Sequence, residues 1–136
     1  LVAQLAASDQ FEIMSGQLAM QKGQSDAVKS MGEMLAAEHR KSSEELKALL
    51  AASDPPVQLP GGLTPELQAR LQALQALNGA EFDRRWLAEQ IAAHQQTYAL
   101  LNGFLGASQP GALKTHAAKA NGVIQKHLNE LNQVRL

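Results

Sequence analysis

The sequence predicts an all-α protein, a four-helix bundle whose two helix pairs are joined by one long crossover. Ala, Leu and Gln dominate the chain and aromatic residues make up only 4% of it, a composition that favours helix over sheet. Apolar residues recur at three- and four-residue spacing over long segments, and no segment alternates apolar and polar residues as a strand would. With 136 residues, the chain suits a single domain, residues 1–136, that buries a substantial core.

Two long helices are expected to open the chain. The first covers about residues 1–22, and Gly23 is a natural residue to stop it. Ser25 then caps a second helix over about residues 25–52, which the run Ser53-Asp54-Pro55-Pro56 ends. The joint between the two helices is tight, so they should lie side by side and antiparallel.

A long connector, residues 53–79, follows. Its first part, up to Leu63, is a loop rich in Pro and Gly, and its second part is a short helix over about residues 64–77. The run Thr64-Pro65-Glu66 marks the helix start with a capping hydroxyl, a proline in the first turn and an acid beside the positive end of the helix dipole.

Two further long helices are expected over about residues 80–105 and 110–134, separated by a break that includes Gly106 and Pro110. Their tight joint makes a second antiparallel pair. The connector between the two pairs is long enough to cross the whole bundle. A ferritin-like topology with one crossover, which carries the short extra helix, is therefore preferred to simple up-down-up-down order.

Four polar residues occupy positions where a helix bundle favours leucine: Glu12, His39, His94 and His127. Each lies on a different long helix among apolar residues at helical spacing. Counting about 1.5 Å per residue from the bundle ends places the first three at one depth, with His127 offset by one to two helical turns. These four side chains are the candidate metal ligands.

Imidazole is the standard neutral ligand for Zn, Cu, Ni and Fe, and a carboxylate adds compensating charge. The sequence therefore predicts a binding protein with one divalent transition metal in its core. The alternative is a metal-free structural or partner-interaction module, in which the same side chains form a buried hydrogen-bond network. An enzyme is the third reading and is less favoured: there is no Cys, and the chain has neither a strand-borne nucleophilic Ser nor a Gly-rich phosphate loop.

A di-iron carboxylate site of the ferritin type is not expected. Such sites need Glu-x-x-His on two of the helices. The residues three positions before the three histidines are instead Ala36, Ile91 and Ile124.

Composition also limits the classes of partner that are expected. Twelve Lys and Arg against thirteen Asp and Glu leave no basic face for nucleic acid. The longest stretch without a charged residue, 90–113, holds too many polar residues for a transmembrane segment. A protein partner or a homo-oligomer is left open.

Two other polar residues have simpler expected roles. His116, beside two lysines and off the apolar row, is expected on the solvated surface. Asp83 is expected as an acid near a helix N-terminus.

Several motifs spread along nearly the whole chain resemble a bacterial family, the domain of unknown function 4142. They are Phe11-Glu12 with Leu18-Ala19, the run Met34-Leu35-Ala36-Ala37-Glu38-His39 (where the family usually has Asp-His), the run Asn78-Gly79-Ala80-Glu81-Phe82-Asp83, Gln90 with His94, and His127-Leu128. The chain departs from the family pattern at Trp86, usually Tyr, and around residues 121–123, where members usually carry a Pro.

Members of this family are often labelled outer membrane proteins and have a ferritin-like fold. The resemblance implies export to the periplasm or cell envelope, with a signal peptide already removed from this chain, which opens with Leu1. It implies no established activity.

Overall fold

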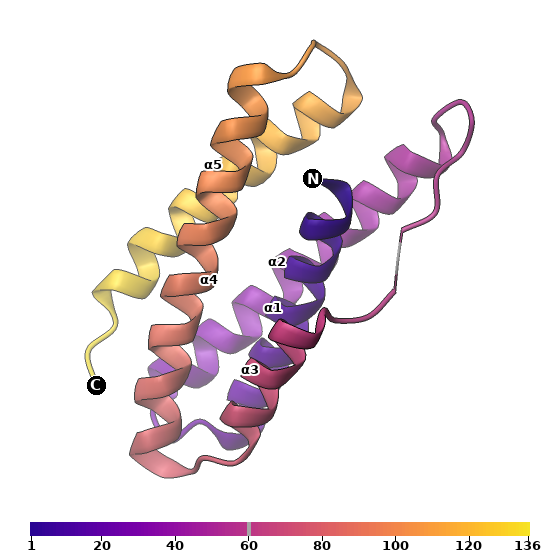
Figure 1. The fold of residues 1–136 in the computed structure, drawn as a ribbon. Coiled ribbons are helices and arrows are strands. Elements are labelled where there is room, and N and C mark those ends of the chain that lie inside the picture. Colours follow the sequence, from indigo (N-terminus) through magenta and orange to yellow (C-terminus); the bar gives the residue numbers. More distant parts are fainter. Residues whose placement is uncertain (60) are drawn as a thin grey trace.

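The computed structural model describes residues 1–59 and 61–136, and the regular elements of this described part are all helices (Figure 1). Pro60, in the predicted loop, lies outside the described residues. The five helices are α1 (Val2–Lys22), α2 (Asp26–Ala51), α3 (Pro65–Gln75), α4 (Gly79–Ala107) and α5 (Ala112–Gln133). The predicted all-α helical bundle is confirmed, and each helix begins and ends within two residues of its predicted bounds.

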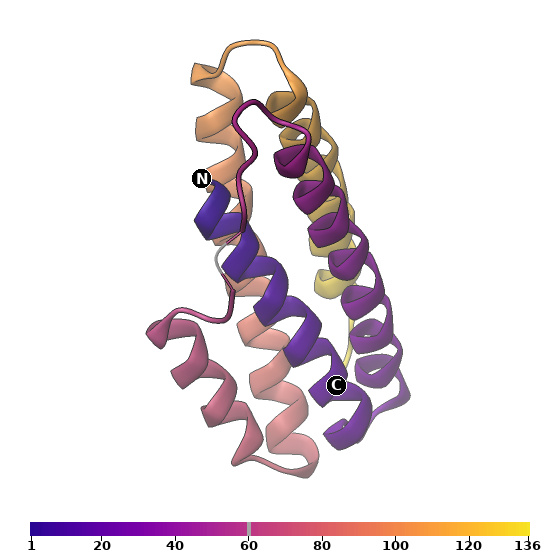
Figure 2. The same cartoon turned by 90° about the vertical axis from the view of Figure 1, so that its right-hand side faces the viewer.

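The two pairs of long helices are antiparallel, α1 with α2 and α4 with α5 (Figures 1 and 2). The connector from the end of α2 returns along the bundle, and α3 within it packs against α1 and α4. As a result α4 begins at the end of the bundle where α1 and α2 are joined. The buried carboxylate of Asp83 fixes this arrangement by accepting hydrogen bonds from the backbone N–H groups of Gln24 (2.9 Å) and Ser25 (2.8 Å).

Local signals in the sequence explain where the helices begin. Ser25 Oγ accepts a hydrogen bond from the Val28 N–H at 3.1 Å, and Thr64 Oγ1 accepts one from the Leu67 N–H at 3.2 Å. Both side chains satisfy N–H groups that a helix N-terminus leaves without a backbone partner. The two predicted caps are therefore confirmed.

Gly23 ends α1 for a different reason from the one expected. Its φ of −59° is not left-handed, so conformational freedom is not what selects glycine there. A Cβ at this position would lie 2.5 Å from the carbonyl oxygen of Ala19 and 3.1 Å from Val28. Glycine is required because the chain turns tightly against its own neighbours.

A layer of polar side chains divides the core into two apolar clusters. One cluster contains Phe11, Leu35 and Trp86 and lies toward the turn between α1 and α2. The other contains Leu46 and Leu101 and lies toward the opposite end. Along every long helix the polar layer falls between residues of the two clusters, so its members are held inside the bundle by apolar packing above and below.

Candidate metal centre

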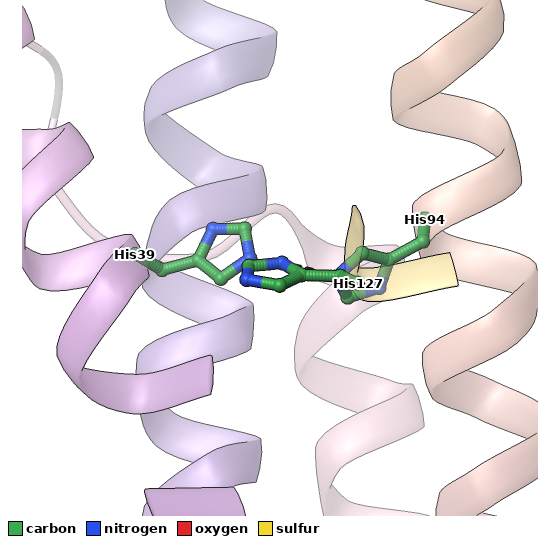
Figure 3. Close-up of side chains that lie close together, drawn as sticks. All are labelled: His39, His94 and His127. Carbon is green, nitrogen blue, oxygen red and sulfur yellow. Dashed lines mark hydrogen bonds between the residues drawn. The ribbon is translucent and has the colours of Figure 1, made fainter. Parts of the chain in front are cut away.

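Three histidines from three helices meet in the polar layer: His39 on α2, His94 on α4 and His127 on α5 (Figure 3). Their ring centroids lie 5.3 to 5.5 Å apart. Their relative exposures are 4%, 1% and 0%. Each can offer one ring nitrogen such that the three ligand atoms lie within 4.8 Å of one another, so the group could hold a metal ion.

One nitrogen of each ring faces outward and donates to an oxygen. His39 Nδ1 donates to the Asp9 carboxylate at 2.8 Å, and His94 Nδ1 donates to the backbone carbonyl of Gln90 at 2.7 Å. His127 Nε2 donates to the Glu38 carboxylate. Carbonyl and carboxylate oxygens accept hydrogen bonds, so these contacts assign the proton of each neutral imidazole to its outer nitrogen.

The inner nitrogens are therefore left with lone pairs. His94 Nε2 lies 3.3 Å from His127 Nδ1, and a nitrogen of His39 points toward the other two rings (Figure 3). Among the described residues, the buried Nε2 of His39 has no hydrogen-bond partner. Lone pairs that face each other in a dry core repel, and a buried polar atom without a partner is costly. A cation among the three nitrogens removes both penalties.

Glu12 also lies in this layer, but not among the three inner nitrogens. Its Oε2 is 3.8 Å from His94 Nδ1, the nitrogen that faces away from the other two rings. The Gln90 amide lies between Glu12 and Ser15, and with its nitrogen turned toward Glu12 it donates to that carboxylate while its oxygen accepts from Ser15 Oγ at 2.8 Å. Glu12 therefore contacts the rim of the cluster.

The electrostatics of the layer are set by burial. The pKa of Glu12 is raised to about 7, chiefly by burial, with the charge of His39 opposing the rise and that of Asp9 adding to it. Burial also lowers the pKa of His94 to about 3, with the His39 charge acting in the same direction. His94 is therefore neutral at pH 7, as a metal ligand must be.

The other two imidazoles are balanced by carboxylates. For His127, burial lowers the pKa, and the hydrogen bond to Glu38 offsets this only in part. For His39, burial again lowers the pKa, but the hydrogen bond to Asp9 and the charge of Glu12 outweigh burial and leave the pKa raised. His39 is the ring of the three that holds a second proton most firmly.

Two predictions about histidines are wrong. His127 was expected one to two turns away in depth, but it lies level with the others because α4 extends to Ala107 and α5 starts at Ala112. His94 is thus 13 residues before the end of α4 and His127 is 15 residues after the start of α5. His116 was expected in solvent but is only 8% exposed. It shares one face of α5 with Ala120, Val123 and His127, so the buried stripe is wider than a single apolar row.

Sequence reasoning did not single out the carboxylates that hold the rings. Asp9 is 7% exposed and lies on the same inner face of α1 as Glu12, which is the signal that could have identified it. Glu38 was visible only as the residue beside His39. Asp83 was expected merely as an acid near its own helix start, whereas it binds the turn between α1 and α2.

A small cavity of about 20 Å³ borders the cluster and is lined by Asp9, Glu38, His39 and His116, among others. This volume is enough for about one water molecule. None of the helices in residues 1–59 and 61–136 combines the length and the apolar character needed to cross a membrane.

Nearly the whole chain matches the model of a known protein family. The model of a family described as domain of unknown function (DUF4142) matches residues 1–134. No curated protein and no solved structure matches.

Proposed function

The chain belongs to the DUF4142 family, and we propose that it binds one divalent transition-metal ion through Nε2 of His39, Nε2 of His94 and Nδ1 of His127. The observation that supports this most directly is the common orientation of the three rings. Each donates its outer N–H to an oxygen, from Asp9, Gln90 or Glu38. This is the arrangement by which metal-binding histidines are oriented and made more basic.

The ligand set favours a borderline cation. Three imidazoles suit Zn²⁺, Cu²⁺, Ni²⁺ and Fe²⁺, and the absence of Cys removes thiolate ligands from the choice. Three protein ligands leave a further coordination position for water or a small anion. The cavity of about 20 Å³ that borders His39 has room for about one water molecule on that side of the centre.

The charges around the rings also favour a dication. Asp9, Glu12 and Glu38 lie around the three imidazoles. Asp9 and Glu12 are buried, and buried carboxylates are costly unless a positive charge lies close by. In this proposal Glu12 contributes charge compensation from the rim and direct ligation comes from the three imidazoles.

The test is metal analysis of protein purified without a polyhistidine tag, combined with thermal unfolding in the presence of each candidate ion. A bound ion is expected at about one per chain in the inductively coupled plasma mass spectrum. Metal at 100 times its Kd should stabilise the fold by about 2.7 kcal/mol. His116→Ala is the matched control, because it removes the remaining histidine and keeps the centre intact. No bound metal and no thermal shift with any of the four ions would overturn the proposal.

A metal-free network is the second candidate, and the raised pKa of His39 favours it. A second proton on His39 would face the two neutral rings and supply the missing positive charge. In that case the core polar groups fix helix register and the protein is a structural or partner-binding module. It would then unfold at the same temperature with and without metal.

The family resemblance supports a location in the periplasm or cell envelope. Fractionation of cells that express the natural full-length gene product, followed by immunodetection, tests this part of the proposal. Recovery of the protein in the cytoplasmic fraction alone would contradict it.

A further inference from the structure

Two cavities lie in series between α2 and α5. The inner one, about 20 Å³, borders Asp9 and His39 at the centre. The outer one, about 90 Å³, lies beside the surface charges of Lys41, Glu45 and Lys119. The two share part of their lining: Glu38, Ser42, His116, Ala120 and Val123. The two adjacent cavities, which together are called the α2–α5 groove, lie one behind the other between the surface and His39.

The sequence explains why space remains between α2 and α5 along this groove. Ser42 and Ala120 line both cavities, and their short side chains fill little of the space between the helices. Ion pairs bridge the groove, Lys126 with Glu38 at 3.4 Å and Lys119 with Glu45 at 2.8 Å. Both lysine side chains are 58% exposed. Solvent-exposed pairs contribute little free energy, so these bridges can open without a large cost.

Groups that bind cations lie along the groove. Glu45 borders the outer cavity, His116 borders both cavities, and Glu38 borders both while holding His127. Burial lowers the pKa of His116, so its imidazole is neutral at pH 7 and has a lone pair to offer. Successive oxygen and nitrogen ligands of this kind let an ion lose its hydration shell in steps.

We propose that the α2–α5 groove is the route by which a hydrated divalent transition-metal ion reaches the three-histidine centre, with His116 as a transient ligand on the way. This inference rests on the proposed function. It makes His116 a residue that controls the rate of metal exchange and not the final affinity, because it is not among the three rings whose nitrogens converge.

A larger pocket on the other side of the bundle is less suited to this role. About 340 Å³ in volume, it lies between α1, α3 and α4. In the described part of the chain its lining includes none of the three histidines, and it has only Thr97 in common with the inner cavity. Thr97 Oγ1 and Ser8 Oγ are hydrogen-bonded at 3.0 Å and close that side.

The test is stopped-flow loading of the metal-free protein with Co²⁺, in which the absorption of the bound Co²⁺ is recorded over time. Val123→Phe and Ser42→Leu fill the groove from opposite walls, and His116→Ala removes the transient ligand. Each should slow both association and dissociation of Co²⁺ by at least about tenfold, with Kd and the absorption spectrum of the bound ion unchanged. Leu100→Phe, in the pocket between α1, α3 and α4, is the matched control and should load at the wild-type rate.

The outcomes separate the two proposals. If wild-type protein takes up no Co²⁺, Zn²⁺, Cu²⁺, Ni²⁺ or Fe²⁺, the metal centre and this route both fail. If it loads and the groove-filled variants load equally fast, only the route is overturned. The route would also be overturned if Leu100→Phe slowed Co²⁺ loading as much as Val123→Phe does. Circular dichroism establishes that each variant is folded, and two groove variants keep the test decisive if one of them is not.

Discussion

Nε2 of His94 and Nδ1 of His127 lie 3.3 Å apart in the core, on antiparallel helices. That spacing would suit a hydrogen bond, but the other nitrogen of each ring already donates to Gln90 or Glu38. In the neutral tautomers both facing atoms are acceptors. The contact is thus unfavourable for two neutral rings and favourable once a cation lies beside them.

Replacement of His94 by leucine should separate stability from metal binding. His94 is buried and its pKa is about 3, so the neutral ring resembles an apolar residue in size while bringing polar atoms into the core. In the presence of EDTA, His94→Leu should leave the free energy of unfolding unchanged or raise it by about 1 kcal/mol. The metal-dependent rise in Tm should vanish. Urea denaturation and thermal unfolding measure the two effects, with His116→Leu as a control that keeps the metal-dependent shift.

The carboxylates of Asp9 and Glu38, which accept the outer N–H groups of two rings, should increase the affinity for metal without being ligands themselves. Asp9→Asn and Glu38→Gln replace an acceptor that orients His39 or His127 with an amide of similar shape. Each change should weaken metal binding by about 10- to 100-fold, measured by competition with a chelating dye. Glu44→Gln, an exposed substitution on the same helix, should leave the affinity as it is. Equal affinities for all four proteins would contradict the assigned ring orientations.

Glu12 should make the metal-free protein less stable as pH rises. Its folded pKa of about 7 exceeds the ordinary value of 4.5, so the folded state holds the proton more tightly than the unfolded state does. The stabilisation this gives is complete below pH 4.5 and is lost as pH rises through 7. Glu12→Gln should therefore be more stable than wild type at pH 8 in EDTA, by up to about 3 kcal/mol.

Chemical denaturation of wild type and Glu12→Gln between pH 4 and 8 measures this difference. The comparison matters because His94, with its lowered pKa, acts in the opposite direction over part of the same range, and its contribution cancels between the two proteins. Glu33→Gln, an exposed substitution, should show the same dependence of unfolding free energy on pH as wild type. A Glu12→Gln curve parallel to that of wild type would contradict the prediction, because it would mean that folding does not change the pKa of Glu12.

Asp83 should matter for the fold and not for the centre. Asp83→Asn leaves one oxygen to accept where two carboxylate oxygens now bind the N–H groups of Gln24 and Ser25. The cost should be about 1–3 kcal/mol of unfolding free energy. Since Asp83 lies eleven residues before His94 on α4, about 16 Å along the helix, metal affinity should not change. Urea denaturation and metal titration of the same sample test both halves of the prediction.

Local signals explain how much of the fold could be predicted. Ser25 and Thr64 cap helices through contacts three residues away, and the prolines at 55 and 56 end a helix without reference to anything distant. The crossover followed from connector length, because tight joints force antiparallel neighbours and a long connector does not. The ferritin-like classification rests on connector length and on family resemblance, and it stays a prediction.

The candidate site was predictable only in part. Placing His39, His94 and His127 on inner faces needed only helical periodicity. The depth of His127 depended on two extra residues of α4 and a later start of α5, a difference that sequence signals do not resolve. Burial of His116 depended on how α5 packs against α2, and the pairings with Asp9 and Glu38 span 30 and 89 residues.

The sequence by itself determined which segments are helical, which faces turn inward and which polar side chains those faces carry. These properties depend on interactions within a few residues and on a fixed helical period. Only the tertiary structure decided the level at which the helices meet, the oxygen each imidazole donates to and the nitrogen each leaves free. Those depend on the rotation and axial shift of one helix against another, which packing across the whole core sets.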